Sequence, residues 1–255
     1  MTKEIIKFNH INKKFGKNEV IKDLSFSISE GEFITVLGSS GSGKTTTLKM
    51  INGLEKPTAG QIIVNDQDLK DANLVELRRH IGYVVQSIGL FPHMTISQNI
   101  AVTPKLLGWD QKKIDLKVKD LLEVVGLDNE EYANRYPTQL SGGQQQRVGV
   151  ARALSTNPPL MLFDEPFSAL DAITRQNLQK EIKSLHQKLA KKTFFFVTHD
   201  INEALYLGDR VMVMNHGQIE QFDTPSKIAN QPATEYVRNL IGTVRENQAL
   251  WENFK

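Results

Sequence analysis

The chain of 255 residues contains no cysteine, which excludes disulfide bonds and thiolate catalysis and agrees with a reducing compartment. It also lacks any run approaching the roughly 18 apolar residues that a membrane-spanning helix needs. The N-terminal stretch MTKEIIKFNHINKKFG is charged throughout and has no apolar core of the kind found in signal peptides. We therefore expect a soluble, cytoplasmic protein that acts at a membrane only through a partner.

An excess of charge of either sign is also missing. Thirty-one lysines and arginines against 29 aspartates and glutamates give a formal net charge of +2, and the two signs are interleaved along the chain. Without a basic stripe, the electrostatic attraction that supports nucleic-acid binding is weak, and we expect no nucleic-acid partner. Hydrophobic residues make up 40% of the chain, which is enough to bury one sizeable core or two small ones.

The hydrophobic pattern predicts an α/β protein that opens with antiparallel strands. Two alternating segments, IIKFNHI and VIKDLSFSI, flank a turn at FGKNE. The apolar run FITVL then leads into GSSGSGKTTTLKMINGL, where glycines give way to a helical pattern. We interpret this as a strand, loop and helix unit, followed by strands at QIIVNDQDL and HIGYVVQ with the helix NLVELRR between them.

The region from Phe91 to Asn157 reads as helical throughout, with apolar residues at helical spacing before a stop at Gly126, namely Leu121, Leu122, Val124 and Val125. PLMLFDE and FFFVTHD are nearly continuous apolar runs, as in parallel strands buried on both faces, and residues 173–192 form the crossover helix between them. RVMVMNHGQIEQFD predicts a hairpin that turns at HG, and the tail from Pro225 onward is helical.

The segment Gly38 to Thr45 has the form G-x-x-x-x-G-K-T. Glycines let backbone amides surround phosphates, the following helix directs its N-terminus at negative charge, and Lys44 reaches the β and γ phosphates. The Thr45 hydroxyl suits Mg²⁺. We assign nucleotide binding to the loop and the first residues of its helix: Gly38, Ser39, Ser40, Gly41, Ser42, Gly43, Lys44, Thr45 and Thr46.

Polar residues follow three of the predicted strands, at the edge where open α/β sheets bind ligands. Asp164 suits an outer ligand of Mg²⁺, and Glu165 is placed to orient or deprotonate an attacking water. Two acids after a strand are on their own more often solvated, but the phosphate loop in the same chain favours the functional interpretation. His199 either contacts the γ phosphate or is structural, and Gln86 either coordinates Mg²⁺ or is an exposed polar residue.

The stretch LSGGQQQR precedes another predicted helix. Ser141 and Gln144 have the spacing of a capping box, which accounts for the helix start but not for Gly142 and Gly143. Glycines are poor in a first helical turn unless a ligand approaches the backbone closely, and an N-terminus with a serine hydroxyl is suited to an anion. Because the chain already has one phosphate loop, a two-fold dimer would give this second site the other subunit's nucleotide.

The order GSSGSGKT, Gln86, LSGGQ, LMLFDE, SALD and His199 resembles the ATPase subunit of ATP-binding cassette (ABC) transporters over nearly the whole chain. The resemblance implies a P-loop NTPase (RecA-like) core with an antiparallel β subdomain over residues 1–90 and 158–222. An inserted helical subdomain at 91–157 and a helical tail at 223–255 complete the expected fold. The resemblance also implies that two copies sandwich two ATP molecules head to tail, each with Mg²⁺, between one phosphate loop and the other copy's LSGGQ.

The same resemblance assigns roles to single residues. Phe15 stacks on adenine, Glu165 is the catalytic base, His199 is the switch histidine, and Asp171 carries signals across the dimer. Mg²⁺ is bound by Thr45, Gln86 and Asp164. The partner's ATP is bound by Ser141, Gly142, Gly143 and Gln144. Many family members have tyrosine where this chain has Phe15, which leaves the stacking ring intact.

Within the family, the segments 88–109, 135–154 and 163–175 resemble the importers of glycine betaine, carnitine and choline. Transmembrane permease subunits, an extracellular substrate-binding protein and a place on the inner face of the membrane follow from that resemblance. Many such ATPases carry regulatory domains after the cassette; this sequence stops at Lys255, so we expect those domains to be absent here, by nature or by truncation. We expect Leu90, Phe91 and Met94, in the segment after Gln86, to dock the permease, although a packed domain junction explains them equally well.

Three alternative hypotheses remain open. In the first, the transported solute is an amino acid or a polyamine. In the second, the chain is a soluble cassette ATPase that acts on DNA or ribosomes, and in the third it binds ATP without hydrolysing it. The second class usually has a long coiled coil or two cassettes in one chain, and the third conflicts with intact Asp164, Glu165 and His199.

Overall fold

The computed structural model describes residues 3–86 and 89–252, which divide into two compact units. Unit 1 contains the described residues up to Leu74 and those from Thr193 onward, and unit 2 spans Val75–Lys192. Among the helices of the described residues, none is both long and apolar enough to cross a membrane.

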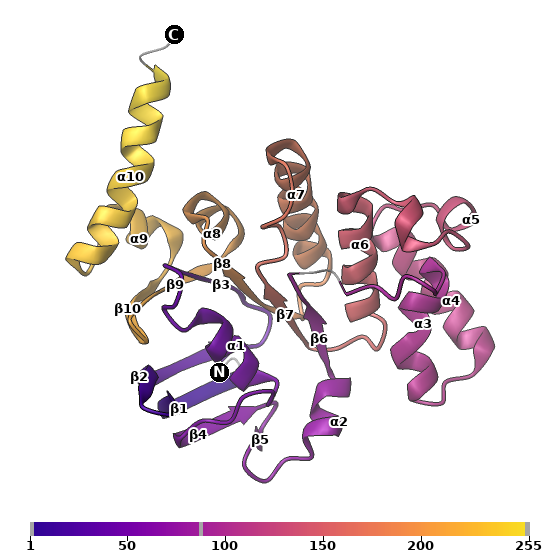
Figure 1. The fold of residues 1–255 in the computed structure, drawn as a ribbon, viewed down its shortest axis with the longest axis horizontal. Helices are drawn as coiled ribbons and strands as arrows, with labels where there is room; N and C mark the ends of the chain where they lie inside the picture. The colour runs from indigo at the N-terminus through magenta and orange to yellow at the C-terminus, as the bar shows by residue number, and fades with distance from the viewer. Residues whose placement is uncertain (1–2, 87–88, 253–255) are drawn as a thin grey trace. The chain divides into compact units, whose positions relative to one another are not determined.

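Unit 1 opens with an antiparallel sheet in the order β2-β1-β4-β5 (Figure 1). β1 (Glu4–Phe15) pairs on one side with β2 (Asn18–Ser29) and on the other with β4 (Ala59–Val64), which pairs in turn with β5 (Gln67–Asp68). The predicted antiparallel start is therefore confirmed. The segment expected as one strand at QIIVNDQDL instead turns between β4 and β5 at Asn65 and Asp66, which both have positive φ.

The second set of strands in unit 1 runs in the order β10-β9-β3-β8. β3 (Phe33–Gly38) lies parallel to both β8 (Thr193–Thr198) and β9 (Arg210–Asn215), and every residue of β3 and β8 is buried. β9 and β10 (Gln218–Asp223) form the predicted hairpin, whose turn at His216 and Gly217 has two residues of positive φ.

Four helices accompany these strands in the described part of unit 1: α1 (Lys44–Ile51), α8 (Ile201–Leu207), α9 (Pro225–Asn230) and α10 (Glu235–Glu252). The helical tail is thus two helices, with a break before Glu235. α9 and α10 contribute Ile228, Val237 and Ile241 to a buried apolar cluster with residues of β3, α8 and β9.

Unit 2 contains the parallel pair β6 (Ile81–Val84) and β7 (Leu160–Asp164), and α2 (Leu74–Arg79) begins at its boundary. Between the strands, the described residues form helices: α3 (Ile96–Leu106), α4 (Gln111–Val124), α5 (Asn129–Tyr132), the short 3-10 turn η1 (Pro137–Gln139) and α6 (Gly142–Ala153). After β7, α7 (Ala172–Lys188) is the predicted crossover helix.

Three of the four apolar residues named at the end of α4 are buried. Leu121, Leu122 and Val125 are buried and Gly126, at a φ of 68°, ends the helix as predicted, but Val124 points outward with 42% of its surface exposed. β6 ends at Val84, so Gln86 lies in the loop beyond the strand and not at its last position.

Candidate nucleotide-binding site

The phosphate loop lies between β3 and α1 in unit 1, as its sequence predicts (Figure 1). Gly38 can only be glycine, because a Cβ there would come within 2.2 Å of the Met214 carbonyl oxygen on β9. Gly41 and Gly43 have φ values of 79° and 100°, a backbone conformation that side chains disfavour. Gly43 caps α1 without a side-chain hydrogen bond, so the helix begins on bare backbone.

Two backbone carbonyls of the loop hold the ammonium group of Lys44. Lys44 is buried and its Nζ donates to the carbonyl oxygens of Gly38 at 2.8 Å and Ser39 at 3.0 Å, while the Ser42 amide donates to Ser39 at 3.2 Å. The Ser42 hydroxyl is buried without a hydrogen-bond partner among the described residues. A cation and a helix N-terminus in one loop are complementary to phosphate oxygens.

His199 follows the strand next to the loop. In the parallel pairing of β3 with β8, Leu37 lies opposite Thr198, so the phosphate loop and His199 leave the sheet at the same edge. His199 is exposed, and the next residue, Asp200, caps α8 by accepting from the amides of Asn202 at 2.8 Å and Glu203 at 3.2 Å. The cap fixes the chain directly after the histidine.

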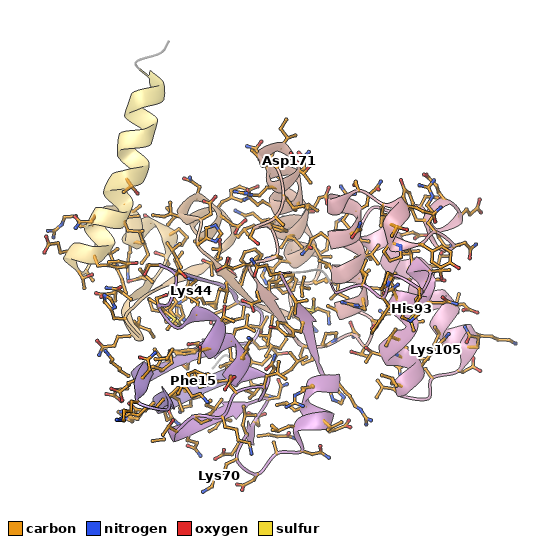
Figure 2. All side chains as sticks on the ribbon, in the orientation of Figure 1. Phe15, Lys44, Lys70, His93, Lys105 and Asp171 are labelled. Carbon is orange, nitrogen blue, oxygen red and sulfur yellow. The ribbon has the colours of Figure 1, made fainter. Side chains whose placement is uncertain are left out.

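Phe15, at the end of β1, keeps 45% of its surface exposed. Its ring lies 4.4 Å from the ammonium group of Lys13, and Figure 2 shows it in unit 1 beside the strands of the antiparallel sheet. An exposed aromatic face with a cation beside it suits a nucleotide base.

Asp164 and Glu165 lie at the carboxyl end of β7, in unit 2. The Tyr83 hydroxyl on β6 donates to Asp164 at 3.3 Å, and burial together with the Asp164 charge raises the pKa of Tyr83, so the phenol stays a donor. Glu165 has a φ of 45°, a left-handed conformation that is rare for a residue with a side chain. Such strain persists where surrounding contacts impose it and often marks a functional residue.

Ser168 connects Gln86 to this strand end. Its hydroxyl donates to the Glu165 carbonyl at 3.0 Å and accepts from the Gln86 amide at 3.1 Å. Unit 2 therefore brings Gln86, Asp164 and Glu165 together. No sequence motif marks Tyr83, and Ser168 is marked only by its place in SALD.

These donors fit Mg²⁺ bound together with phosphate. In the part of the chain that the structure describes, no cluster of three or more His, Cys, Asp or Glu side chains could hold a metal ion unaided. Mg²⁺ usually takes one or two protein oxygens and fills its other positions with water and substrate phosphates. Within unit 2, Gln86 and Asp164 offer side-chain oxygens of the kind that Mg²⁺ takes.

The LSGGQ stretch begins α6 with the predicted capping box. The Gln144 amide donates to the Ser141 hydroxyl at 3.3 Å, and the Ser141 amide donates to the Gln144 side chain at 2.9 Å. The structure gives a reason for glycine at position 143 that the local sequence does not indicate. A Cβ there would lie 2.8 Å from Thr174 Cγ2 on α7. Packing therefore accounts for Gly143, whereas a Cβ added at exposed Gly142 would lie 3.4 Å from Leu170, an ordinary contact distance.

A pocket of about 360 Å³ adjoins this helix start, lined by residues that include Tyr132, Ser141, Gly143 and Gln144. Asp171, labelled in Figure 2, caps α7 by accepting from the amides of Ile173 at 3.1 Å and Thr174 at 3.0 Å. The hydrogen bonds from Thr174 and Ile173 hold the pKa of Asp171 below its usual range, so the residue carries a negative charge.

The loop, its flanking strand and helix, and the polar strand ends define an α/β protein of the P-loop nucleotide-binding class. The family profile described as ABC transporter matches residues 21–168. This chain belongs to the ABC transporter family.

Two relatives and one solved structure are informative. The chain is 51% identical over 242 residues to the carnitine transport ATP-binding protein OpuCA of Listeria monocytogenes, covering 94% of this chain and 60% of that protein. It is 49% identical over 242 residues to the glycine betaine/carnitine/choline transport ATP-binding protein OpuCA of Bacillus subtilis, covering 94% of this chain and 63% of the relative. The chain thus spans less than two thirds of both relatives' lengths.

Among solved structures, the dimeric post-hydrolysis state of the ATP-binding cassette MJ0796 bound to ADP and Pi is similar with a TM-score of 0.75. The two chains are 35% identical, and the similarity covers 86% of this chain and 98% of that one. The cassette fold expected from the sequence is confirmed.

Proposed function

We propose that the chain is the ATP-hydrolysing subunit of an importer for quaternary ammonium osmoprotectants such as glycine betaine, carnitine and choline. The observation that carries nucleotide binding is the phosphate loop, in which Lys44 is held by the Gly38 and Ser39 carbonyls at the start of α1. The choice of solute rests on the printed names of the two relatives.

In this proposal the phosphates lie on the loop, with Lys44 neutralising the β and γ phosphates and Phe15 stacking on adenine. Thr45, Gln86 and Asp164 hold Mg²⁺, which when bound offsets negative charge on the phosphates. Glu165 accepts a proton from the attacking water, and His199 donates to the γ phosphate. Ser168 holds Gln86 and the Glu165 backbone in one hydrogen-bonded chain, which orients both groups.

A second copy completes each site. Ser141, Gly142, Gly143 and Gln144 bind the ATP held by the partner's phosphate loop, and two identical patches are used head to tail. The solved cassette that resembles this chain is dimeric and contains ADP and Pi, which supports this arrangement. Asp171, charged and exposed, belongs to the same interface.

Transmembrane permease subunits receive the conformational change, and the complex lies on the inner face of the membrane with a substrate-binding protein outside. Phe91 keeps 40% of its surface exposed, and we assign it with Leu90 and Met94 to permease docking. Ser87 and Ile88 of the same segment lie outside the described residues.

The test is to isolate the complex from membranes, identify its subunits, and measure ATP-driven uptake of glycine betaine, carnitine and choline alongside spermidine and an amino acid. Uptake of the quaternary ammonium solutes with co-purified hydrophobic subunits is the expected result. Uptake of spermidine or the amino acid alone would reassign the solute. ATP turnover that DNA or ribosomes stimulate, without membrane partners, would overturn the transport assignment.

A further inference from the structure

The side chain of Tyr236 on α10 contacts the phosphate loop. The backbone amide of Ser39, the second residue of the loop, donates a hydrogen bond to the Tyr236 hydroxyl at 3.3 Å. Tyr236 lies 197 residues later in the chain and is the second residue of α10.

Apolar packing holds Tyr236 at this position. Val237 and Ile241 of α10 are buried in one cluster with Leu37, and Tyr236 and Leu240 pack against that cluster. Leu37 is the residue immediately before Gly38. The helix therefore shares a buried cluster with Leu37, before the loop's first glycine, and accepts a hydrogen bond from Ser39, after it.

Both backbone groups of Ser39 make hydrogen bonds. The Ser39 carbonyl accepts from the Lys44 ammonium group at 3.0 Å and from the Ser42 amide at 3.2 Å, while the Ser39 amide donates to Tyr236. Ser39 is exposed, so without the phenol its amide would face water and the backbone here would have fewer restraints. A loop already in its binding conformation loses less entropy when phosphate arrives.

We propose that Tyr236 is a positioning residue for nucleotide binding, whose hydroxyl fixes Ser39 and so prearranges the phosphate loop from α10. This inference rests on the proposed binding of ATP and extends it to a helix outside the sequence motifs. It also makes α10 an element through which a change at the end of the chain alters ATP affinity.

The Tyr236→Phe variant tests the proposal, because the phenyl ring retains the apolar packing and only the hydroxyl is lost. We expect the dissociation constant for ATP to rise roughly two- to tenfold, the range of one neutral hydrogen bond. The turnover number at saturating ATP stays unchanged, and the Ser39 amide exchanges its hydrogen faster while the thermal unfolding midpoint stays within error. Tyr206→Phe, which removes a hydroxyl from a 42% exposed tyrosine on α8, is the matched control.

The possible outcomes separate the proposed function from the role of Tyr236. If wild-type protein binds no ATP, the proposed function fails and this inference falls with it. If wild-type protein binds ATP and Tyr236→Phe binds it equally or more tightly, only the role of Tyr236 is overturned. An equal loss in Tyr206→Phe, or a fall in turnover number with unchanged affinity, also contradicts positioning of the loop.

Discussion

At the scale of single residues, the backbone of Glu165 is the feature that most separates the acid pair from an ordinary strand end. A φ of 45° costs a residue with a side chain about 1 kcal/mol relative to the right-handed region. Ser168 compensates by donating twice to the Glu165 carbonyl, from its amide at 3.3 Å and its hydroxyl at 3.0 Å. A strained position that keeps glutamate and not glycine indicates that the carboxylate is needed there.

Two substitutions separate the carboxylate from the strain. Glu165→Gln is expected to bind ATP and dimerise but to lower the turnover number by about 10²- to 10⁴-fold, because a general base is lost. Glu165→Gly loses the same activity but is more stable than Glu165→Gln by about 1 kcal/mol, because glycine adopts positive φ without strain. Phosphate release, gel filtration with ATP and chemical denaturation measure these effects. A Glu165→Gln protein that stays monomeric with ATP, beside an active wild type, would contradict the sandwich mechanism.

The two glycines of LSGGQ allow a second prediction about single residues. Gly143→Ala places a methyl 2.8 Å from Thr174 Cγ2, and we expect it to lower the free energy of unfolding by about 1–3 kcal/mol through overpacking. Gly142→Ala leaves the free energy of unfolding within about 0.5 kcal/mol of wild type, because it is exposed, but weakens ATP-driven dimerisation.

Thr174→Ser removes the methyl that the new alanine would meet, so the pair Gly143→Ala and Thr174→Ser is expected to recover stability. Denaturation curves of the single and double variants measure this recovery. No recovery would mean that the packing explanation for Gly143 is wrong.

Residue identities in motifs were predictable from sequence, whereas their neighbours were not. The spacing around Lys44 indicated a phosphate loop because glycines, lysine and helix start are adjacent in the chain. Tyr83, Ser168 and Tyr236 act through tertiary contacts, and Ser39 and Tyr236 are 197 residues apart. The positive φ of Glu165, whose carbonyl accepts from Ser168, is likewise not indicated by the hydrophobic pattern.

At the scale of helices and strands, periodicity and caps predicted most of what forms. The buried strands at FITVL, PLMLFDE and FFFVTHD, the hairpin at HG and the stop of α4 at Gly126 are all present. The errors fall at ends and turns: β6 ends at Val84, before Gln86, and Asn65 and Asp66 turn a predicted single strand. Boundaries depend on turn geometry, which hydrophobic alternation does not specify.

Two helix starts in unit 2 have matching capping boxes and so allow a controlled test. At α6, Ser141 accepts from Gln144 at 3.3 Å and its amide donates back at 2.9 Å; at α3, Thr95 and Gln98 show the same two distances. Ser141→Ala and Thr95→Ala should each lower the free energy of unfolding by about 1 kcal/mol. Only Ser141→Ala should also weaken ATP-driven dimerisation, measured by light scattering in the Glu165→Gln background. Equal effects on dimerisation would leave Ser141 with a capping role alone.

At the scale of the whole molecule, the predicted residues fall into two sets: the loop, Phe15 and His199 belong to unit 1, and Gln86, the acid pair, LSGGQ and Asp171 belong to unit 2. In the proposed head-to-tail dimer, each ATP site is made from the loop of one copy and the LSGGQ of the other. The loop and the LSGGQ of one site therefore belong to different copies, so a defect in each can be placed on a different chain. A site completed within a single chain would not have this property.

Mixing two inactive variants tests that property. Lys44→Ala removes the loop's cation, and Ser141→Arg blocks the LSGGQ helix start, so each homodimer has two defective sites. A mixed dimer combines both defects in one site and leaves the other with an intact loop and an intact LSGGQ. An equal mixture of the two variants should recover roughly a quarter of wild-type ATP turnover if the sites act independently, since about half the dimers are mixed.

The double variant mixed with wild type is the control, because both sites of that mixed dimer are defective and only wild-type homodimers hydrolyse ATP. If phosphate release from the two single variants does not rise on mixing, although cross-linking shows that mixed dimers form, each chain completes its own site and the head-to-tail arrangement is wrong.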